Sequence, residues 1–411
     1  MYRKVSQCRI CGNPHLIPIL DLGLQMLTGV FPDSVNPQAA TIGPLCLVKC
    51  MGEATCGLVQ LEHSYDLEEM YGKNYGYRSG LNKSMADHLQ NKVEKLLQYI
   101  SLSAGDLVID VGSNESTTLQ AYDSSNLTLV GIDPTGTKFA SFYPPNITLI
   151  PEFFSSKLIH SFFPNRKAKV ITSFSMFYDL ENPLEFMQQV HSILDDEGIW
   201  VFEQSYLPTM LQTNSFDTVC HEHLEFYALK QIQWMAEKVG FLILDVEFND
   251  VNGGSFSVMV RKKKTGETVL PTITALLEEE AALGLDTLEP FLAFAKRAAE
   301  ARTNLLTYLA QLKKAGKAIA ALGASTKGNV LLQYCGLSAD ELIAVGEVNP
   351  EKFGRYTPGS WIPIVSEDQL LANPPDYLLV LPWHFKSFFL NNPKFRNRKL
   401  IFPLPMLEVI E

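Results

Sequence analysis

Residues 106–134, DLVIDVGSNESTTLQAYDSSNLTLVGIDP, constrain the fold of this chain more than any other segment. An apolar strand is predicted at Leu107–Val111, followed by a turn that begins at Gly112 and a helix that begins near Glu115. The next predicted strand ends in Asp133, 21 residues after Gly112. This is the layout of a nucleotide-binding βαβ unit, in which the acid accepts hydrogen bonds from ribose hydroxyls. The segment therefore predicts an α/β fold.

The turn itself indicates which kind of cofactor the unit binds. A pyrophosphate ligand favours glycine throughout the turn, whereas this turn reads GSNES and carries Glu115. A cofactor without phosphate and with a positive charge fits better, which predicts S-adenosylmethionine. The alternative is a doubly wound domain that binds no cofactor. The expected cofactor-binding residues are Gly112, Ser113, Asn114, Asp133 and Ser173.

Further elements follow at the intervals that such a domain requires. A helix is predicted over Asn82–Ile100, before the first strand, and a fourth strand is predicted to end at Ser173. The segment PLEFMQQVHSILDD predicts a helix, and GIWVFEQSY after it predicts a fifth strand. This order is typical of class I methyltransferases.

The cysteines predict a metal site. Five of the seven lie within the first 56 residues, and two pairs, in CRICG and CMGEATCG, are each followed by glycine. Two such knuckles can enclose one tetrahedral zinc ion. The predicted ligands are Cys8, Cys11, Cys50 and Cys56, whereas Cys46 lies on an apparent strand and is expected to be packed inside. Four sulfurs leave zinc no open position, so the site is expected to be structural; the alternative is a set of buried free thiols.

Composition excludes several classes of protein. The 411 residues carry a formal net charge of −11, which repels nucleic acids and anionic lipids. There is no apolar run of membrane-spanning length, and the first residues lack the apolar run of a signal peptide. We therefore expect a cytoplasmic protein with no nucleic-acid or membrane partner, as a monomer or weak homo-oligomer.

The last third of the chain predicts a second βαβ unit after a helical segment. In AIAALGASTKGNVLLQY, an apolar strand leads through a turn of small residues into a helix start. The helix N-terminus with Ser325, Thr326 and Lys327 is a candidate for binding a diphosphate, and the alternative is a connecting turn with a solvated lysine. The later segment GRYTPGSWIPI predicts an ordered loop, with Tyr356 and Trp361 as possible contacts to a nucleotide base.

The stretch VCHEHLEFY, Val219 to Tyr227, concentrates groups that hold or move protons. Three interpretations are open from the residues alone: a metal clamp, a general-base apparatus, or the polar start of a helix. No other ligand cluster accompanies its two histidines, which disfavours metal.

Taken together, these motifs resemble those of the sugar C-methyltransferases that act on nucleotide-linked 4-keto-6-deoxyhexoses. The resemblance covers essentially the whole chain: the two cysteine knuckles, YGYRSG, GSNES, FDTVCHEHLEFY, NGGSF and GASTKGNVLLQYCG. It implies a zinc domain (residues 1–75), a central class I methyltransferase domain (76–262) and a C-terminal α/β domain (263–411) that contributes to binding of the nucleotide sugar. It also implies that S-adenosylmethionine methylates C-3 of the sugar.

The resemblance assigns roles to single residues. Glu222 and His223 match the catalytic pair, with His223 expected to take the C-3 proton because an ordinary imidazole pKa near 6.5 suits that task. Tyr77 matches a tyrosine near the sugar, and Tyr178 stands where a further histidine is common. Other departures are Glu115-Ser116 in place of Asp-Gly and Cys220 in place of tyrosine. The expected substrate-binding residues are Tyr75, Ser79, Ser325, Lys327 and Tyr356. Alternative functions are a methyltransferase acting on oxygen and a catalytically silent binding module.

Overall fold

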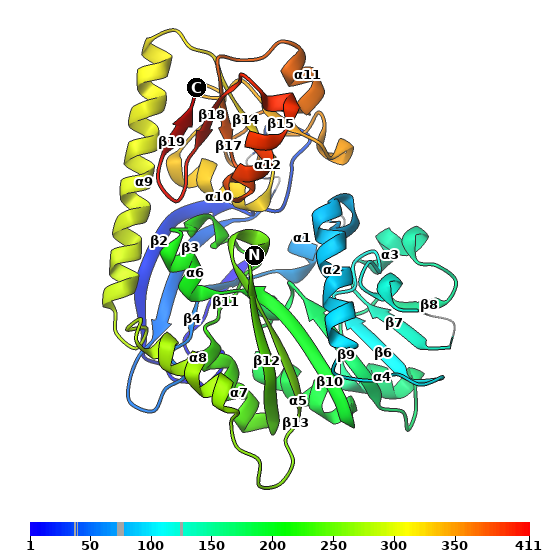
Figure 1. The fold of residues 1–411 in the computed structure, drawn as a ribbon. Helices are drawn as coiled ribbons and strands as arrows, with labels where there is room; N and C mark the ends of the chain where they lie inside the picture. Colours follow the sequence, from blue (N-terminus) through cyan, green and yellow to red (C-terminus); the bar gives the residue numbers. More distant parts are fainter. Residues whose placement is uncertain (37, 39, 72–77, 124–125) are drawn as a thin grey trace.

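The computed structural model describes residues 1–36, 38, 40–71, 78–123 and 126–411. Its strands form three larger sheets and one two-stranded pair (Figure 1). Helices flank the sheets, and α9 (Glu289–Lys314) runs along one side of the molecule, past both the C-terminal and the N-terminal sheet. Among the described residues, no helix combines the length and apolar composition needed to cross a membrane.

The central sheet has seven strands in the order β12-β13-β10-β9-β6-β7-β8. All neighbours pair in parallel except β13, which is antiparallel to both β10 and β12. This mixed α/β sheet is that of the class I methyltransferase fold, as the sequence predicted. In sheet order the strands are Phe241–Asn249, Ser255–Lys262, Leu194–Ser205, Ala168–Phe174, Leu107–Val111, Thr128–Ile132 and Ile147–Ile150.

The N-terminal sheet is built from two regions of the chain that lie far apart in the sequence. Its order is β11-β4-β3-β2, and the strands are Glu225–Phe226, Val59–Leu61, Ile42–Cys50 and Leu16–Met26. The short strand β11 follows directly on the HEHL segment and pairs antiparallel with β4. A separate antiparallel pair joins β1 (Tyr2–Lys4) to β5 (His63–Tyr65).

The C-terminal sheet has six strands in the order β16-β15-β14-β17-β18-β19. Only β19 is antiparallel to its neighbour, so this is a second doubly wound unit. The strands, in that order, are Ile364–Ser366, Val345–Glu347, Ile319–Leu322, Tyr377–Val380, Lys399–Phe402 and Glu408–Ile410.

The helices begin and end where local chemistry favours it. Asn82 caps α2 by accepting a hydrogen bond from Ser84 N–H, and Ser325 caps α10 in the same way through Gly328 N–H. The α-helices are α1 Leu67–Tyr71, α2 Lys83–Leu96, α3 Gly136–Phe139, α4 Ser156–Phe162, α5 Pro183–Ile193, α6 Leu207–Gln212, α7 Leu229–Val239, α8 Pro271–Ala281, α9, α10 Thr326–Cys335, α11 Glu367–Ala372 and α12 Lys386–Asn391.

The prediction of a helix that begins near Glu115 is wrong. The chain instead makes turns and one short 3₁₀ helix, η2 (Leu119–Ala121). Asn114 and Ser116 both adopt positive φ, +49° and +66°, which a right-handed helix cannot include. A second difference concerns the HEH segment, which forms a turn and not the start of a helix.

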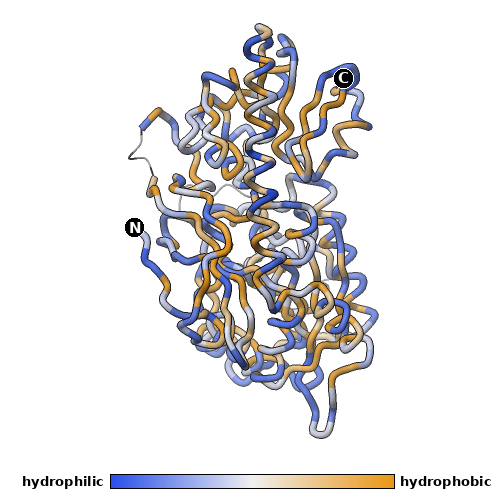
Figure 2. Tube along the Cα trace, turned by 90° about the vertical axis from the view of Figure 1, so that its left-hand side faces the viewer, coloured by the Kyte–Doolittle hydropathy of each residue, from blue (hydrophilic) through white to orange (hydrophobic). Residues whose placement is uncertain are grey.

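The core follows the sheets. Hydrophobic residues run along the strands, while the peripheral loops are largely hydrophilic (Figure 2). One buried cluster joins the C-terminal sheet, α9 and the N-terminal strands, so the two outer sheets share a continuous apolar interior. Burial of apolar surface on this scale is what holds the three sheets against one another.

Candidate active site and zinc centre

The four cysteines predicted to bind zinc come together in the structure. Their sulfur atoms all lie within 4.8 Å of one another, with Cys8 Sγ 3.4 Å from Cys56 Sγ and Cys11 Sγ 3.6 Å from Cys50 Sγ. Zinc–sulfur bonds of about 2.3 Å in a tetrahedron place the sulfurs about 3.8 Å apart, so this set fits one zinc ion. Cys46 lies apart on β3 and is buried, as predicted.

Asp133 lies at the carboxyl end of β7, where the sequence placed the ribose-binding acid. Its Oδ2 accepts a hydrogen bond from Asn114 N–H at 2.8 Å, and its Oδ1 accepts two from Thr135. A carboxylate offers about four acceptor positions, so Oδ2 keeps one for a ribose hydroxyl. Gly112 has a φ of +75°, and a Cβ at this position would lie only 3.0 Å from Met176 Cγ, so the turn passes close to the Met176 side chain. The turn therefore fits the adenosyl part of S-adenosylmethionine.

The segment that leads into the central domain closes over this turn. Arg78 Nε lies 2.7 Å from Glu115 Oε2, Gly80 N–H donates to Glu115 Oε1, and Ser79 N–H donates to Asn114 Oδ1 at 3.2 Å. Glu115 is thus paired with Arg78 and does not offer a free charge to a cofactor, which corrects the reasoning from sequence. The predicted site residues Tyr75 and Tyr77 lie outside the described residues.

Two of the predicted cofactor residues use their hydroxyls inside the protein. Ser113 Oγ is 2.7 Å from Tyr143 Oη, and Ser173 is fully buried with its Oγ accepting from Trp200 Nε1 at 2.9 Å. The side chain of Ser173 thus faces the aromatic core, and its hydroxyl is bonded to Trp200. A contact between Ser173 and the cofactor stays a prediction.

The HEH turn lies where all three larger sheets meet. It follows η5 (Phe216–Thr218) of the central region and leads into β11 of the N-terminal sheet. Leu61 N–H donates to Leu224 O at 2.9 Å, and Leu224 N–H donates to Tyr178 O at 2.8 Å. The turn is thereby fixed from both sides.

His223 is held as a neutral imidazole. Its Nδ1 lies 2.9 Å from Thr218 O, and since a carbonyl only accepts, Nδ1 carries the hydrogen and Nε2 keeps its lone pair. Burial and the nearby Lys327 ammonium lower the pKa of His223 to about 3. The Tyr178 ring packs against it, with the ring centres 4.2 Å apart. The expectation of an ordinary pKa near 6.5 is wrong, because the imidazole is poorly solvated and lies near the Lys327 ammonium.

Glu222 is enclosed by residues of the N-terminal sheet. Thr28 Oγ1 donates to Glu222 Oε2 over 3.4 Å and lies 3.4 Å from Nδ1 of the fully buried His221. Gly29 packs so closely that a Cβ there would overlap Glu222 Oε1. Burial raises the pKa of Glu222.

The C-terminal unit brings Lys327 to the same place. Its ammonium donates to Asn252 O, in the NGGSF loop, and burial lowers its pKa while Asp217 opposes that shift. Lys327 is therefore not a freely solvated side chain. Ser325 is occupied as the cap of α10, through Gly328 N–H at 3.0 Å. Tyr356 N–H donates to Pro32 O at 2.8 Å, which ties its loop to the N-terminal sheet.

Sequence reasoning missed several neighbours of the HEH turn: Thr28, Gly29, Asp217 and Asn252. Thr28, Gly29 and Asn252 lie in other segments of the chain, and no local pattern connects them to Glu222 or His223. Only Asn252, within the NGGSF motif, and Asp217, within FDTVCHEHLEFY, carried a signal in the sequence.

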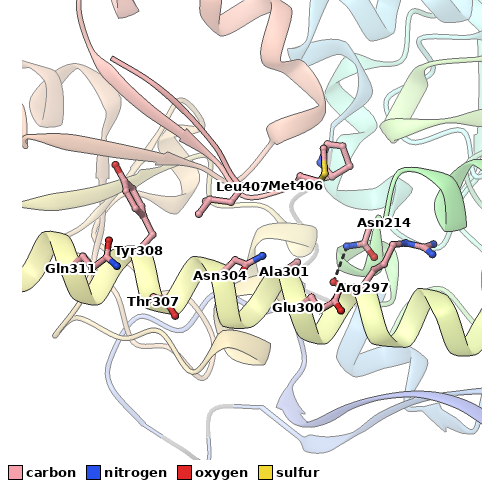
Figure 3. A pocket seen from close by; sticks show the side chains of 11 residues that line it. Asn214, Arg297, Glu300, Ala301, Asn304, Thr307, Tyr308, Gln311, Met406 and Leu407 are labelled. Carbon is pink, nitrogen blue, oxygen red and sulfur yellow. Dashed lines mark hydrogen bonds between the residues drawn. The ribbon is translucent and has the colours of Figure 1, made fainter.

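A cavity of about 560 Å³ lies elsewhere, between α9 and residues 405–407 (Figure 3). Arg297 and Glu300 of α9 line it, as do Asn214 and Met406. Among the described residues, none that was predicted to be catalytic, or to bind a cofactor, a metal or the substrate, belongs to it. The candidate active site is therefore separate from this cavity.

Three protein families match successive parts of the chain. Residues 8–71 match a "Putative zinc binding domain", residues 85–246 a methyltransferase domain, and residues 250–405 a C-methyltransferase C-terminal domain. The fold and these matches define a methyltransferase that uses S-adenosylmethionine and carries a zinc-binding domain.

A full-length relative indicates where the methyl group goes. C-methyltransferase NovU of Streptomyces niveus is 28% identical over 99% of this chain and 97% of its own length. The chain is a C-methyltransferase that carries the three matched domains in succession. It is therefore an enzyme, as the sequence predicted.

Similar solved structures cover less of the chain. The Haloferax volcanii complex of the Trm112 activator with a methyltransferase aligns over 45% of this chain and 95% of that chain, at 12% identity and a TM-score of 0.37. LepI in complex with S-adenosylmethionine aligns over 42% and 46%, at 17% identity and a TM-score of 0.35.

Proposed function

We propose that this C-methyltransferase transfers a methyl group to C-3 of a nucleotide-diphosphate-linked 4-keto-6-deoxy sugar. The observation that carries the proposal is the neutral, oriented imidazole of His223 beside Glu222, at the meeting point of three sheets. A base of this kind, with its free nitrogen facing away from its backbone anchor, is what removal of a proton next to a ketone requires. The C-4 ketone makes the C-3 proton acidic, because the electron pair moves onto the C-4 oxygen as an enolate.

Several residues around His223 are proposed to share the steps of proton removal and enolate stabilisation. His223 Nε2 accepts the C-3 proton, and Thr218 O stabilises the imidazolium that forms, through the hydrogen on Nδ1. Glu222, whose pKa is raised by burial, is the carboxyl group next to His223 in the chain. Tyr178, whose ring packs at a tilt against that of His223, is the proposed donor to the enolate oxygen, which would lower the energy of the developing charge.

S-Adenosylmethionine supplies an electrophilic methyl group when bound. Asp133 and the turn from Gly112 to Asn114 are the residues that would hold its ribose and adenosyl part. The segment 78–80 packs on that turn through Glu115 and Asn114, and so would help to fix its shape around the cofactor.

Lys327 is the proposed binding partner of the diphosphate. It is a partly buried cation close to His223, at the N-terminus of a ten-residue helix whose free N–H groups also favour anions. In the described residues its ammonium donates to one backbone carbonyl, which leaves it donors for phosphate oxygens. We expect Lys327→Met to raise KM for the nucleotide sugar about tenfold and to leave cofactor affinity unchanged.

The test is a product analysis with isotopically labelled cofactor. The purified enzyme is incubated with S-adenosylmethionine labelled with ¹³C in the methyl group and with thymidine- or guanosine-diphosphate-linked sugars, with and without a 4-keto group. We expect the label on carbon C-3, only for keto-sugars. Label on oxygen, or equal turnover of sugars without the ketone, would rule the proposal out.

A further inference from the structure

The loop of residues 27–31, which belongs to the N-terminal sheet, lies against the acidic member of the candidate catalytic pair. Thr28 is fully buried, and its hydroxyl lies within hydrogen-bond distance of Glu222 Oε2. The Cys220 thiol and the Gly29 N–H also donate to the Glu222 carboxyl group. The next residue, Gly29, contacts Glu222 Oε1 so closely that no larger residue fits without moving the carboxylate. One oxygen of Glu222 is therefore bonded to this loop and the other is packed against it.

The loop itself is fixed by the C-terminal unit. Asn329 Nδ2, on α10, donates to Thr28 O at 2.7 Å, and Gln333, one turn further on, makes two hydrogen bonds to the backbone of Met26. At the other end of the loop, Arg355 Nη1 donates to Phe31 O at 3.2 Å. These hydrogen bonds to α10 and Arg355 hold the backbone of the loop in place.

A chain of polar groups runs through the loop. If Thr28 Oγ1 donates to Glu222, it accepts from Nδ1 of His221, which is also fully buried. Both distances are 3.4 Å, so these are long, weak hydrogen bonds that orient the carboxylate without holding it rigidly. Hydrogen bonds of catalytic groups are often long without ligand and shorten in the complex with substrate.

We propose that Thr28 and Gly29 are positioning residues of the methyl transfer, contributed by the N-terminal sheet to set the place of the Glu222 carboxylate. The inference rests on the proposed function, because it assumes that Glu222 acts in proton removal. It makes the N-terminal sheet part of the catalytic centre and not only a structural support. It also explains why strand β11, next to Glu222, joins that sheet.

Three variants test this inference. Thr28→Val removes the hydroxyl and keeps the shape, Thr28→Ser keeps the hydroxyl, and Gly29→Ala adds the Cβ that overlaps Glu222. Thr41→Val is the matched control, since Thr41 Oγ1 makes a hydrogen bond of the same kind, 2.7 Å to Glu69 Oε2, next to the same sheet. The measurements are the rate of C-3 proton exchange of a 4-keto sugar in deuterated water, kcat and KM, and cofactor affinity by calorimetry.

We expect Thr28→Val to lower the exchange rate and kcat about tenfold, and Gly29→Ala to lower them about 100-fold, since small displacements of catalytic groups have effects of that size. KM and cofactor affinity should change less than about twofold. Thr28→Ser should restore most of the rate, and Thr41→Val should leave it unchanged. Cofactor affinity shows that each variant is folded, and if Gly29→Ala does not fold, the comparison of valine with serine at position 28 decides.

The outcomes separate the two proposals. Full exchange and kcat in both Thr28→Val and Gly29→Ala, with an active wild type, would overturn the positioning role and leave the proposed function standing. A loss in Thr41→Val equal to that in Thr28→Val would likewise overturn it, because the effect would then be one of stability. A wild type that exchanges no C-3 proton in any keto-sugar overturns the proposed function and this inference with it.

Discussion

At the scale of single residues, the candidate active site combines an imidazole that stays neutral with a carboxyl group that resists ionisation. Burial lowers the pKa of His223 and raises that of Glu222, because a poorly solvated site disfavours the charged form of each group. Lys327 lowers the pKa of His223 further. When the substrate's negative charge offsets the lysine, the pKa of His223 should rise, which would make it a stronger base toward the C-3 proton.

The protonation of His223 can be predicted with its sign. Since its pKa is lowered to about 3, the imidazole should remain neutral at every pH from 5 to 8, and no step near 6.5 should appear in its titration. Lys327→Met removes one cause of the shift, so the pKa of His223 should rise toward its ordinary value. Nitrogen NMR of the labelled histidine ring, assigned with His223→Asn, measures both.

The control for that titration is Lys352→Met, which removes another buried lysine from the C-terminal unit. It should leave the titration of His223 where it is, since Lys352 faces Glu347 and not the HEH turn. A wild-type pKa near 6.5 would contradict the electrostatic description of the site.

At the scale of elements, the cofactor turn is shaped by a segment that precedes it in the chain. The 3₁₀ helix η1 (Ser79–Leu81) and Arg78 pack on the turn through Glu115 and Asn114. Sequence patterns predicted the strands on either side, because apolar strands and turn residues are local signals. They could not predict that Glu115 leaves the helical path, because its partner Arg78 lies 37 residues away.

The Arg78–Glu115 ion pair gives a prediction at this scale. Arg78→Met should weaken binding of S-adenosylmethionine about three- to tenfold, because it frees the segment that covers the turn and leaves a largely buried carboxylate unpaired. Calorimetric titration measures the change. Lys83→Met, which breaks an exposed ion pair at the start of α2, is the control and should not alter affinity. Equal affinities in Arg78→Met and wild type would show that the segment does not shape the site.

At the scale of the whole molecule, the zinc centre is connected to the catalytic segment. Arg9 lies within the first cysteine knuckle, and its Nε is 3.6 Å from Oε1 of the fully buried Glu225, on β11. The same side chain donates to Leu61 O at 2.7 Å. Folding of the knuckle thus fixes β4 and β11, and with them the HEH turn between the sheets.

Loss of zinc should therefore affect more than the first 70 residues. Cys11→Ser should reduce bound zinc, measured by elemental analysis, from about one ion per chain and should lower the melting temperature and the rate of methyl transfer together. Cys46→Ser changes a buried cysteine of the N-terminal sheet that is not in the zinc cluster, and this variant should keep its zinc and its activity. Full zinc content in Cys11→Ser would contradict the ligand set.

The sequence predicted what depends on local signals: the strands around Gly112, the cysteine cluster and the second doubly wound unit. It also led to Glu222 and His223, through the motif that contains them. What it could not predict is the assembly. Thr28, Glu222 and Lys327 meet only because three sheets pack together, and the pKa of His223 depends on that burial. Hydrogen bonds between distant segments have no counterpart in the spacing of residues.

Exchange of the sugar's C-3 proton with deuterated water tests the central claim most directly, because it isolates the step that His223 is proposed to perform. Wild-type enzyme with a nucleotide-linked 4-keto-6-deoxy sugar should introduce one deuterium at C-3, detected by NMR. His223→Asn should reduce the rate at least about 100-fold while its affinity for S-adenosylmethionine stays unchanged. Exchange at the wild-type rate in His223→Asn would contradict the account.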